Sequence, residues 1–264
     1  MLEIFSYSFM IRAFVAAGVI GVVAPLIGTF LVAKRYALMA DSLAHVSLAG
    51  VAIGLLLGVS PLITAVVATV FTALVIEQLR AQKRLSGEAG LAMFLSGGLA
   101  IAIVLMNIGQ GLNANVMSYL FGSIITVTPT ELWIIGGLGF VILASIGLLY
   151  QEFVAVAFDE EAALVSGVPV RRLNTILMVL TALTVSIAMR IVGVLLIGAL
   201  MVIPVVTATQ LRQSFRATIA CAILFSTSAV ICGLVGSYYF DIAPGGSIVV
   251  SALLLFFLTT FLKR

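Results

Sequence analysis

The chain has 264 residues, of which 63% are hydrophobic and only 9% are charged, and its formal net charge is +3. A soluble domain carries about 25% charged residues, so this composition excludes a water-soluble globular protein. A net charge this small gives no support to a nucleic-acid partner. The composition predicts one all-α domain over residues 1–264, a polytopic bundle of transmembrane helices in contact with membrane lipid.

The apolar segments predict nine spans, because a helix needs about 20 apolar residues to cross a bilayer. In chain order they lie at residues 10–33, 38–57, 61–79, 90–109, 131–150, 173–190, 192–210, 217–236 and 246–262. The seventh follows Arg190 directly and contains Pro204. An eight-span alternative stays open, in which a segment around Pro25 or Pro204 breaks or re-enters the membrane.

The basic residues predict the orientation of these spans, since cytoplasmic loops are rich in lysine and arginine. With the N-terminus outside, the inner loops hold eleven of the thirteen basic residues, namely Lys34, Arg35, Arg80, Lys83, Arg84, Arg171, Arg172, Arg212, Arg216, Lys263 and Arg264. Only Arg12 and Arg190 fall elsewhere. This distribution favours nine spans with a cytoplasmic C-terminus.

Two ionisable residues, Asp41 and His45, lie just inside the second predicted span, and His45 is the only histidine of the chain. Residues four apart share one face of a helix, and ionisable groups within spans usually face a cavity or a pathway. A carboxylate and an imidazole together suit zinc, and also manganese. Two ligands do not close a site, so a second copy of the chain or another helix would complete it. The alternative is that Asp41 caps the helix and His45 bonds to a neighbouring carbonyl.

The opposite face of the same span carries glycine at every fourth position, at Gly50, Gly54 and Gly58. Small residues at this spacing allow another helix to approach closely. The sequence therefore predicts that one face of this helix packs against a neighbour while the other holds the polar pair.

The longest inner connection, residues 157–170, carries its own helix signals. Asp159 can cap a helix, Glu160 and Glu161 favour its first turn, Gly167 suits its C-terminal end, and Pro169 prevents continuation. A helix of about two turns is marginal in isolation, so we expect it to dock on another surface. The alternative is that it lies against the inner face of the chain itself.

Sequence signatures of catalysis are missing from the chain. A phosphate-binding P-loop needs a glycine followed by lysine and then serine or threonine, and none of the three lysines follows a glycine. There is also no zinc-protease motif and no paired-cysteine metal signature. We expect a transport subunit and no enzyme, with any ATP hydrolysis on a separate chain.

Five segments in order resemble the permease subunit of ABC importers for zinc and manganese. They are KRYALMADSLAHVSLAG at 34–50, SYLFGSIITVTPTEL at 118–132, AFDEEAALVSGVPV at 157–170, RIVGVLLIGALMVIPVVTATQL at 190–211 and SYYFDIAPGGSIVV at 237–250. The resemblance runs along nearly the whole chain. It implies a fold related to the permeases for cobalamin and siderophore complexes, in a bacterial cytoplasmic (inner) membrane.

The resemblance also implies partners and residue roles. Two copies of the permease form the pathway, a cytoplasmic ABC ATPase dimer docks on them, and an extracytoplasmic metal-binding protein delivers the ion. The signature places Asp41 and His45 on the metal pathway, and the coupling segment 157–170 turns Asp159, Glu160, Glu161 and Gly167 toward the ATPase.

The expected cargo is a divalent metal ion, with no permanently bound cofactor. The segment DSLAHVSLAG is more similar to zinc-type members, so zinc is expected, and manganese or iron is the alternative. A stand-alone secondary metal transporter, with Asp41 and His45 as proton-relay groups, is the alternative from another class.

Overall fold

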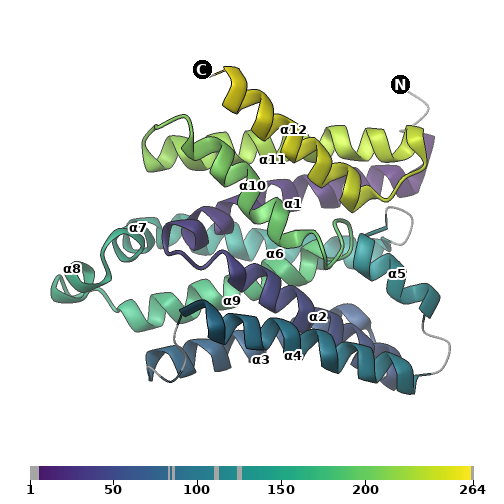
Figure 1. Cartoon of the computed structure of the whole chain (residues 1–264), viewed down its shortest axis with the longest axis horizontal. Coiled ribbons are helices and arrows are strands. Elements are labelled where there is room, and N and C mark those ends of the chain that lie inside the picture. The colour runs from purple at the N-terminus through teal and green to yellow at the C-terminus, as the bar shows by residue number, and fades with distance from the viewer. Residues whose placement is uncertain (1–5, 83, 85–86, 110–112, 124–126, 263–264) are drawn as a thin grey trace.

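The computed structural model describes residues 6–82, 84, 87–109, 113–123 and 127–262, and these residues form α-helices with no strand among them (Figure 1). The helices are α1 Ser8–Ala33, α2 Leu38–Leu57, α3 Pro61–Ala81, α4 Gly87–Ile108, α5 Asn113–Phe121, α6 Pro129–Leu148, α7 Tyr150–Phe158, α8 Glu160–Val165, α9 Val170–Ala188, α10 Ile197–Thr209, α11 Phe215–Phe240 and α12 Pro244–Leu262. The predicted all-α fold is confirmed.

Eight of the described helices are long and apolar enough to cross a membrane. They match eight of the nine predicted spans to within a few residues at each end. The segment predicted at 192–210 differs, because its helix α10 has only 13 residues. At 1.5 Å per residue α10 is about 20 Å long, against a hydrocarbon thickness of about 30 Å.

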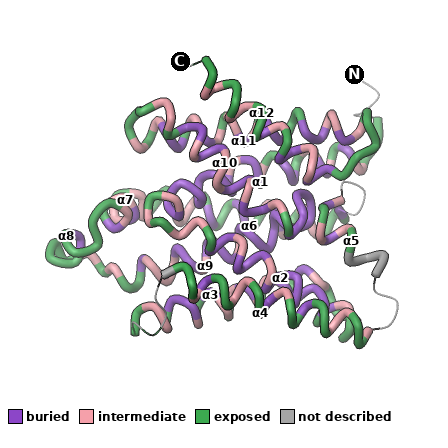
Figure 2. The backbone as a smooth tube through the Cα atoms, viewed as in Figure 1, coloured by how far each residue is buried: buried purple, intermediate pink, exposed green. Residues whose placement is uncertain are grey.

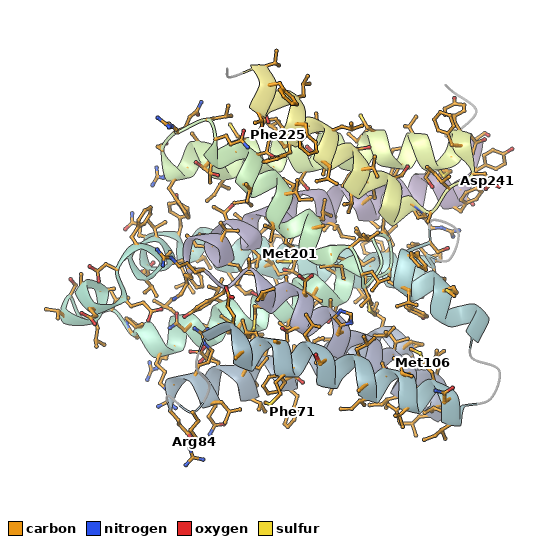
Figure 3. All side chains as sticks on the ribbon, viewed as in Figure 1. Phe71, Arg84, Met106, Met201, Phe225 and Asp241 are labelled. Atoms are coloured by element: carbon orange, nitrogen blue, oxygen red, sulfur yellow. The ribbon has the colours of Figure 1, made fainter. Side chains whose placement is uncertain are left out.

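The long helices run back and forth between two ends of the molecule (Figure 1). Arg84 lies at the left-hand end in Figure 3 and Asp241 at the right-hand end. We call the left-hand end the basic end, because it holds Arg84, Lys34 at the end of α1 and Arg216 in the first turn of α11. Helix α1 starts at the right and α12 finishes toward the left.

Helices α1 and α2 form the interior, and both are largely buried within the chain (Figure 2). Helix α1 packs against α6, α9, α10 and α11, while α2 packs against α3, α4, α9 and α10. Helices α4, α6 and α12 are mostly exposed, and their exposed side chains include Trp133, Phe140 and Phe257. An exposed apolar surface of this extent suits contact with lipid tails.

Two of the three glycines on α2 are packed tightly against α3. A Cβ on Gly50 would lie 2.7 Å from the Cα of Ala65, and one on Gly54 would lie 2.8 Å from the Cα of Pro61. Gly58 does not belong to this face, contrary to the prediction, because a Cβ there would meet no atom within 4 Å. It adopts φ 66° and ends α2 in the left-handed conformation that glycine favours.

The chain between α9 and α10 is not helical and pairs with the segment that follows α5. The Val194 N–H donates to the Tyr119 carbonyl at 2.9 Å, and the Ser123 N–H donates to the Arg190 carbonyl at 3.1 Å. Gly122 and Gly193 adopt φ of 77° and 86° where these two segments meet. These bonds replace part of the helical ladder and explain why α10 begins only at Ile197.

Arg190 is held inside this region and does not extend to the outer surface. Its guanidinium forms an ion pair with Glu131 at 2.7 Å and lies 5.0 Å from the centre of the Tyr119 ring. Glu131 also closes a capping box with Thr128 at the start of α6. The ion pair therefore fixes the non-helical segment to the first turn of α6.

Candidate functional site

Helix α2 is open to its surroundings at only two positions along its central length. From Met39 to Ala52 every residue is buried except Asp41 and His45, which are partly exposed. The other polar residues of this stretch are satisfied inside the protein, because the Ser42 hydroxyl donates to the Leu91 carbonyl at 2.8 Å. The structure thus places the two predicted ligands on one open strip of an otherwise enclosed helix.

The carboxylate of Asp41 lies against the first turn of α10. A Cβ built on Gly198 would be only 1.9 Å from Asp41 Oδ1. Asp41 does not cap its own helix, since the residue before α2 is Ala37 and no side chain bonds to the free N–H groups there. The carboxylate therefore lies at the contact between α2 and α10.

The backbone at His45 is fixed by α4. A Cβ on Gly98 would lie 2.9 Å from the Val46 nitrogen and 3.1 Å from the His45 carbonyl carbon, so the two helices touch through this glycine. The Nδ1 atom of His45 is buried and has no hydrogen-bond partner. The expected alternative, in which His45 satisfies a neighbouring carbonyl, finds no support among the described residues.

The described part of a single chain does not assemble a complete metal site from acidic, histidine and cysteine side chains. Within the described residues no group of three or more such side chains lies close enough to hold an ion. A donor pair of one carboxylate and one imidazole is consistent with half of a four-ligand site.

The coupling segment forms a short helix at the basic end, as its capping residues predict. The Asp159 carboxylate accepts a hydrogen bond from the Ala162 N–H at 2.9 Å and so caps α8. Gly167 has φ 83°, and the Val168 N–H bonds back to the Ala163 carbonyl at 3.0 Å. The helix α8 has six residues and is therefore slightly shorter than the two turns expected. Before it lies α7, a separate helix that was not predicted, most of which falls between the span expected to end at residue 150 and the segment 157–170.

Glu160 differs from the other acidic residues of this segment because it forms an ion pair with a residue outside the segment. Its carboxylate forms an ion pair with Lys34, which lies in the turn between α1 and α2. Lys34 Nζ also donates to Asn174 Oδ1 on α9 at 2.6 Å. Glu161 and Gly167 are exposed. No local pattern indicates the pairing of Lys34 with Glu160, since 126 positions separate them.

The turn that holds Lys34 is also attached to α3. The Arg80 guanidinium lies 3.6 Å from the centre of the Tyr36 ring. Burial raises the pKa of the Tyr36 phenol, and the charge of Arg80 offsets only part of this effect. Tyr36 therefore stays neutral and acts as a flat surface for the cation. We call Lys34, Tyr36, Arg80, Glu160 and Asn174 the turn cluster.

An apolar patch that the sequence analysis did not single out surrounds α8. Phe158, Leu164 and Val165 are 70%, 64% and 89% exposed, at the basic end of the molecule. A cavity of about 260 Å³ lies beside the patch and is lined in part by Lys34, Phe158 and Glu160. Exposed apolar groups next to a cavity indicate a surface for a protein partner. Apolar residues among the acidic ones of 158–165 are the signal that could have revealed it.

Comparison with known proteins gives one family and several full-length relatives. The model of the ABC 3 transport family matches residues 6–263. The chain is 40% identical over 240 residues to a probable metal transport system membrane protein of Treponema pallidum, covering 91% of this chain and 90% of that protein. It is 32% identical to the manganese transport system membrane protein MntC of Halalkalibacterium halodurans, over 98% and 89% of the two chains. It is also 32% identical to the high-affinity zinc uptake system membrane protein ZnuB of Haemophilus influenzae, over 92% and 93%.

Solved structures share the fold. PsaBC from Streptococcus pneumoniae in complex with Fab contains a chain that matches with TM-score 0.86 and 31% identity, over 96% of this chain and 91% of that one. A metal-chelate type ABC transporter in an inward-facing conformation matches with TM-score 0.74 and 17% identity, over 96% and 85%, which shows the fold alone. The helix arrangement, the multi-pass membrane character and the sequence agree over nearly the full length, and the chain belongs to the ABC 3 transport family.

Proposed function

We propose that this chain is the membrane-spanning permease subunit of an ATP-driven importer for a divalent metal ion. The observation that carries the proposal is the open strip on α2, where Asp41 and His45 are the two accessible positions between Met39 and Ala52. Ionisable groups at such a position mark ion pathways. The names of the relatives, which include metal, manganese and zinc transport systems, support the same activity.

The basic end is assigned to the cytoplasm by the positive-inside rule, which places the end of α12 there as well. The membrane is then the bacterial cytoplasmic membrane. On this side the apolar patch of Phe158, Leu164 and Val165 offers a docking surface for a separate ATPase. A dimer of that ATPase would supply the hydrolysis for which the chain has no P-loop.

Two copies of the permease would line one pathway, each contributing one Asp41 and one His45. Two carboxylates and two imidazoles form a four-ligand set of the kind that zinc accepts in a tetrahedral site. An extracytoplasmic binding protein would deliver the ion to the opposite end. Closure of the ATPase pair would move α8, and the ion pair of Glu160 with Lys34 would pass that movement to α2.

Zinc is the favoured cargo. The sequence around the pair, DSLAHVSLAG, is similar to zinc-type signatures. A carboxylate together with an imidazole also suits zinc, which is an ion of borderline softness. Manganese is the second candidate, because a relative of equal identity carries a manganese name. The comparison of radioactive zinc and manganese uptake under identical conditions distinguishes the two.

The test uses the permease assembled in proteoliposomes with its ATPase and binding protein. Asp41→Asn and His45→Gln should each abolish ATP-dependent zinc uptake, while Glu88→Gln, which alters an exposed carboxylate at the basic end, should not. Uptake that continues with a hydrolysis-deficient ATPase would favour the stand-alone transporter. Wild-type uptake by the Asp41→Asn variant at equal protein abundance would remove the metal role of the pair.

A further inference from the structure

Gly198 is the second residue of α10, and the carboxylate of Asp41 occupies the position that a side chain at 198 would take. A Cβ on Gly198 would lie 1.9 Å from Oδ1, 2.6 Å from Cγ and 3.0 Å from Oδ2 of Asp41, closer than real Cβ atoms approach other atoms. No backbone atom is among these three nearest neighbours. The missing side chain of Gly198 therefore leaves room for the carboxylate and for nothing else.

Helix α10 is not free to move away and make room for a side chain at position 198. One turn later a Cβ on Gly28 of α1 would lie 2.0 Å from the Met201 carbonyl oxygen, so the α10 backbone is already in direct contact with α1. Helices α11 and α12 also pack against α10. Just before α10, a Cβ on Gly245 would lie 1.8 Å from the Val192 carbonyl oxygen. Because the α10 backbone is enclosed, a side chain added at position 198 would displace the side chain of Asp41 and not the helix.

On the other side of the carboxylate, α2 is held as firmly. Gly98 of α4 touches the backbone at His45 and Val46, and Gly50 touches α3. The backbone that carries the His45 side chain is therefore held in place one turn from Asp41. The buried Nδ1 atom of His45 has no hydrogen-bond partner. The separation between the two donors depends on where the Asp41 carboxylate rests, and α10 limits that position.

We propose that Gly198 is a positioning residue for the metal site, which sets how tightly the Asp41–His45 pair holds the ion. The inference deepens the proposed function and rests on it. A methyl group at 198 would displace Oδ1 by at least about 1 Å to restore ordinary contact. Carboxylate and imidazole ligands bind zinc at about 2.0–2.2 Å. After a displacement of this size the Asp41 carboxylate and the His45 imidazole no longer reach one ion at these distances together.

The main measurement is the dependence of ATP-driven zinc uptake on zinc concentration, with the assembled transporter in proteoliposomes. Gly198→Ala should raise the half-saturating zinc concentration by about 10- to 100-fold, the range for residues that orient metal ligands. Gly136→Ala on α6 is the matched control, because a Cβ there meets nothing within 4 Å, and it should leave this concentration unchanged. A wild-type value for Gly198→Ala at equal abundance would overturn the proposal.

A second pair of variants separates positioning from general packing. Gly28→Ala directs its methyl group at backbone and should lower the thermal stability of the purified chain far more than Gly198→Ala does. In the Asp41→Ala background the space beside Gly198 is empty, so adding Gly198→Ala should cause no further loss of thermal stability. A further loss there would show a structural role and overturn the positioning role.

The same set of variants tells this inference apart from the proposed function. If Asp41→Ala takes up zinc as the wild type does, the metal role of the pair fails and Gly198 has no ligand to position. If Asp41→Ala is inactive and Gly198→Ala behaves as the wild type, only the role of Gly198 fails.

Discussion

Lys34 and Glu160 join the turn before α2 to the helix exposed at the basic end. The Lys34 side chain is only 4% exposed, while that of Glu160 is 44% exposed. The pair connects segments 126 positions apart and is supported by Asn174 on α9. Four residues after Lys34, α2 begins, and Asp41 lies in its first turn. A displacement of α8 therefore has a direct route to the candidate metal site.

The first prediction concerns this ion pair. Glu160→Gln should lower metal uptake per ATP hydrolysed, because α8 then loses its charged attachment to the α1–α2 turn while the proposed docking patch is unchanged. The ratio is measured with radioactive zinc and released phosphate in the same vesicles. The exchange of both residues, Lys34→Glu with Glu160→Lys, should restore part of the ratio. If the ratio stays at the wild-type value in Glu160→Gln, the pair does not transmit motion.

The second prediction concerns the apolar patch on α8. Val165→Asp should prevent copurification of the ATPase, because a carboxylate in an apolar interface is desolvated without a partner. Val59→Asp, at an exposed valine beyond the far end of α2, is the matched control and should copurify normally. The membrane abundance of both variants should equal that of the wild type. Retention of the ATPase by Val165→Asp would place its docking surface elsewhere.

The third prediction concerns Arg190 and Glu131, whose side chains are 8% and 16% exposed. Removing one partner from a buried ion pair costs about 3–5 kcal/mol, so Glu131→Gln should lower the thermal stability of the purified chain. The double variant Glu131→Gln with Arg190→Met should be less destabilised than Glu131→Gln alone, because no charge is then left behind. Equal melting temperatures for the wild type and Glu131→Gln would contradict this expectation.

The fourth prediction separates the glycines of α2 by their physical roles. Gly50→Ala should destabilise the chain, since its methyl group would meet the Ala65 backbone at 2.7 Å. Gly58→Asn should be tolerated, because position 58 has open space and asparagine accepts the left-handed conformation. Gly58→Val should be costly for its backbone conformation alone. Thermal unfolding in one detergent compares the three variants, and a ranking with Gly58→Asn as the least stable would contradict the assignment.

Much of the fold could be predicted because membrane spans are local features. Apolar length located the eight long helices, and the lysine and arginine residues of the connections predicted one basic end, which the structure shows. The caps of α8 were also readable, since Asp159 and Gly167 act through the backbone within three or four residues.

Features that depend on distant partners could not be predicted in this way. The segment 189–196 is as apolar as a span, and only its pairing with 119–123 reveals why α10 starts late. Gly50 and Gly58 look alike in the sequence, although one faces α3 and the other ends its helix. The contact of Gly198 with Asp41 crosses 157 positions, and no local pattern distinguishes this glycine from the others.

The late start of α10 also bears on the order in which the chain is built into the bilayer. Backbone groups inside a bilayer need hydrogen-bond partners, and residues 189–196 find some of theirs in Tyr119, Leu120 and Ser123. These partners are synthesised earlier, so the region around α5 has to be in place when α10 emerges. Gly245, which closes over Val192, is made last. The non-helical segment before α10 therefore takes its partners from both directions along the chain, from the region around α5 that is made before it and from α12 that is made after it.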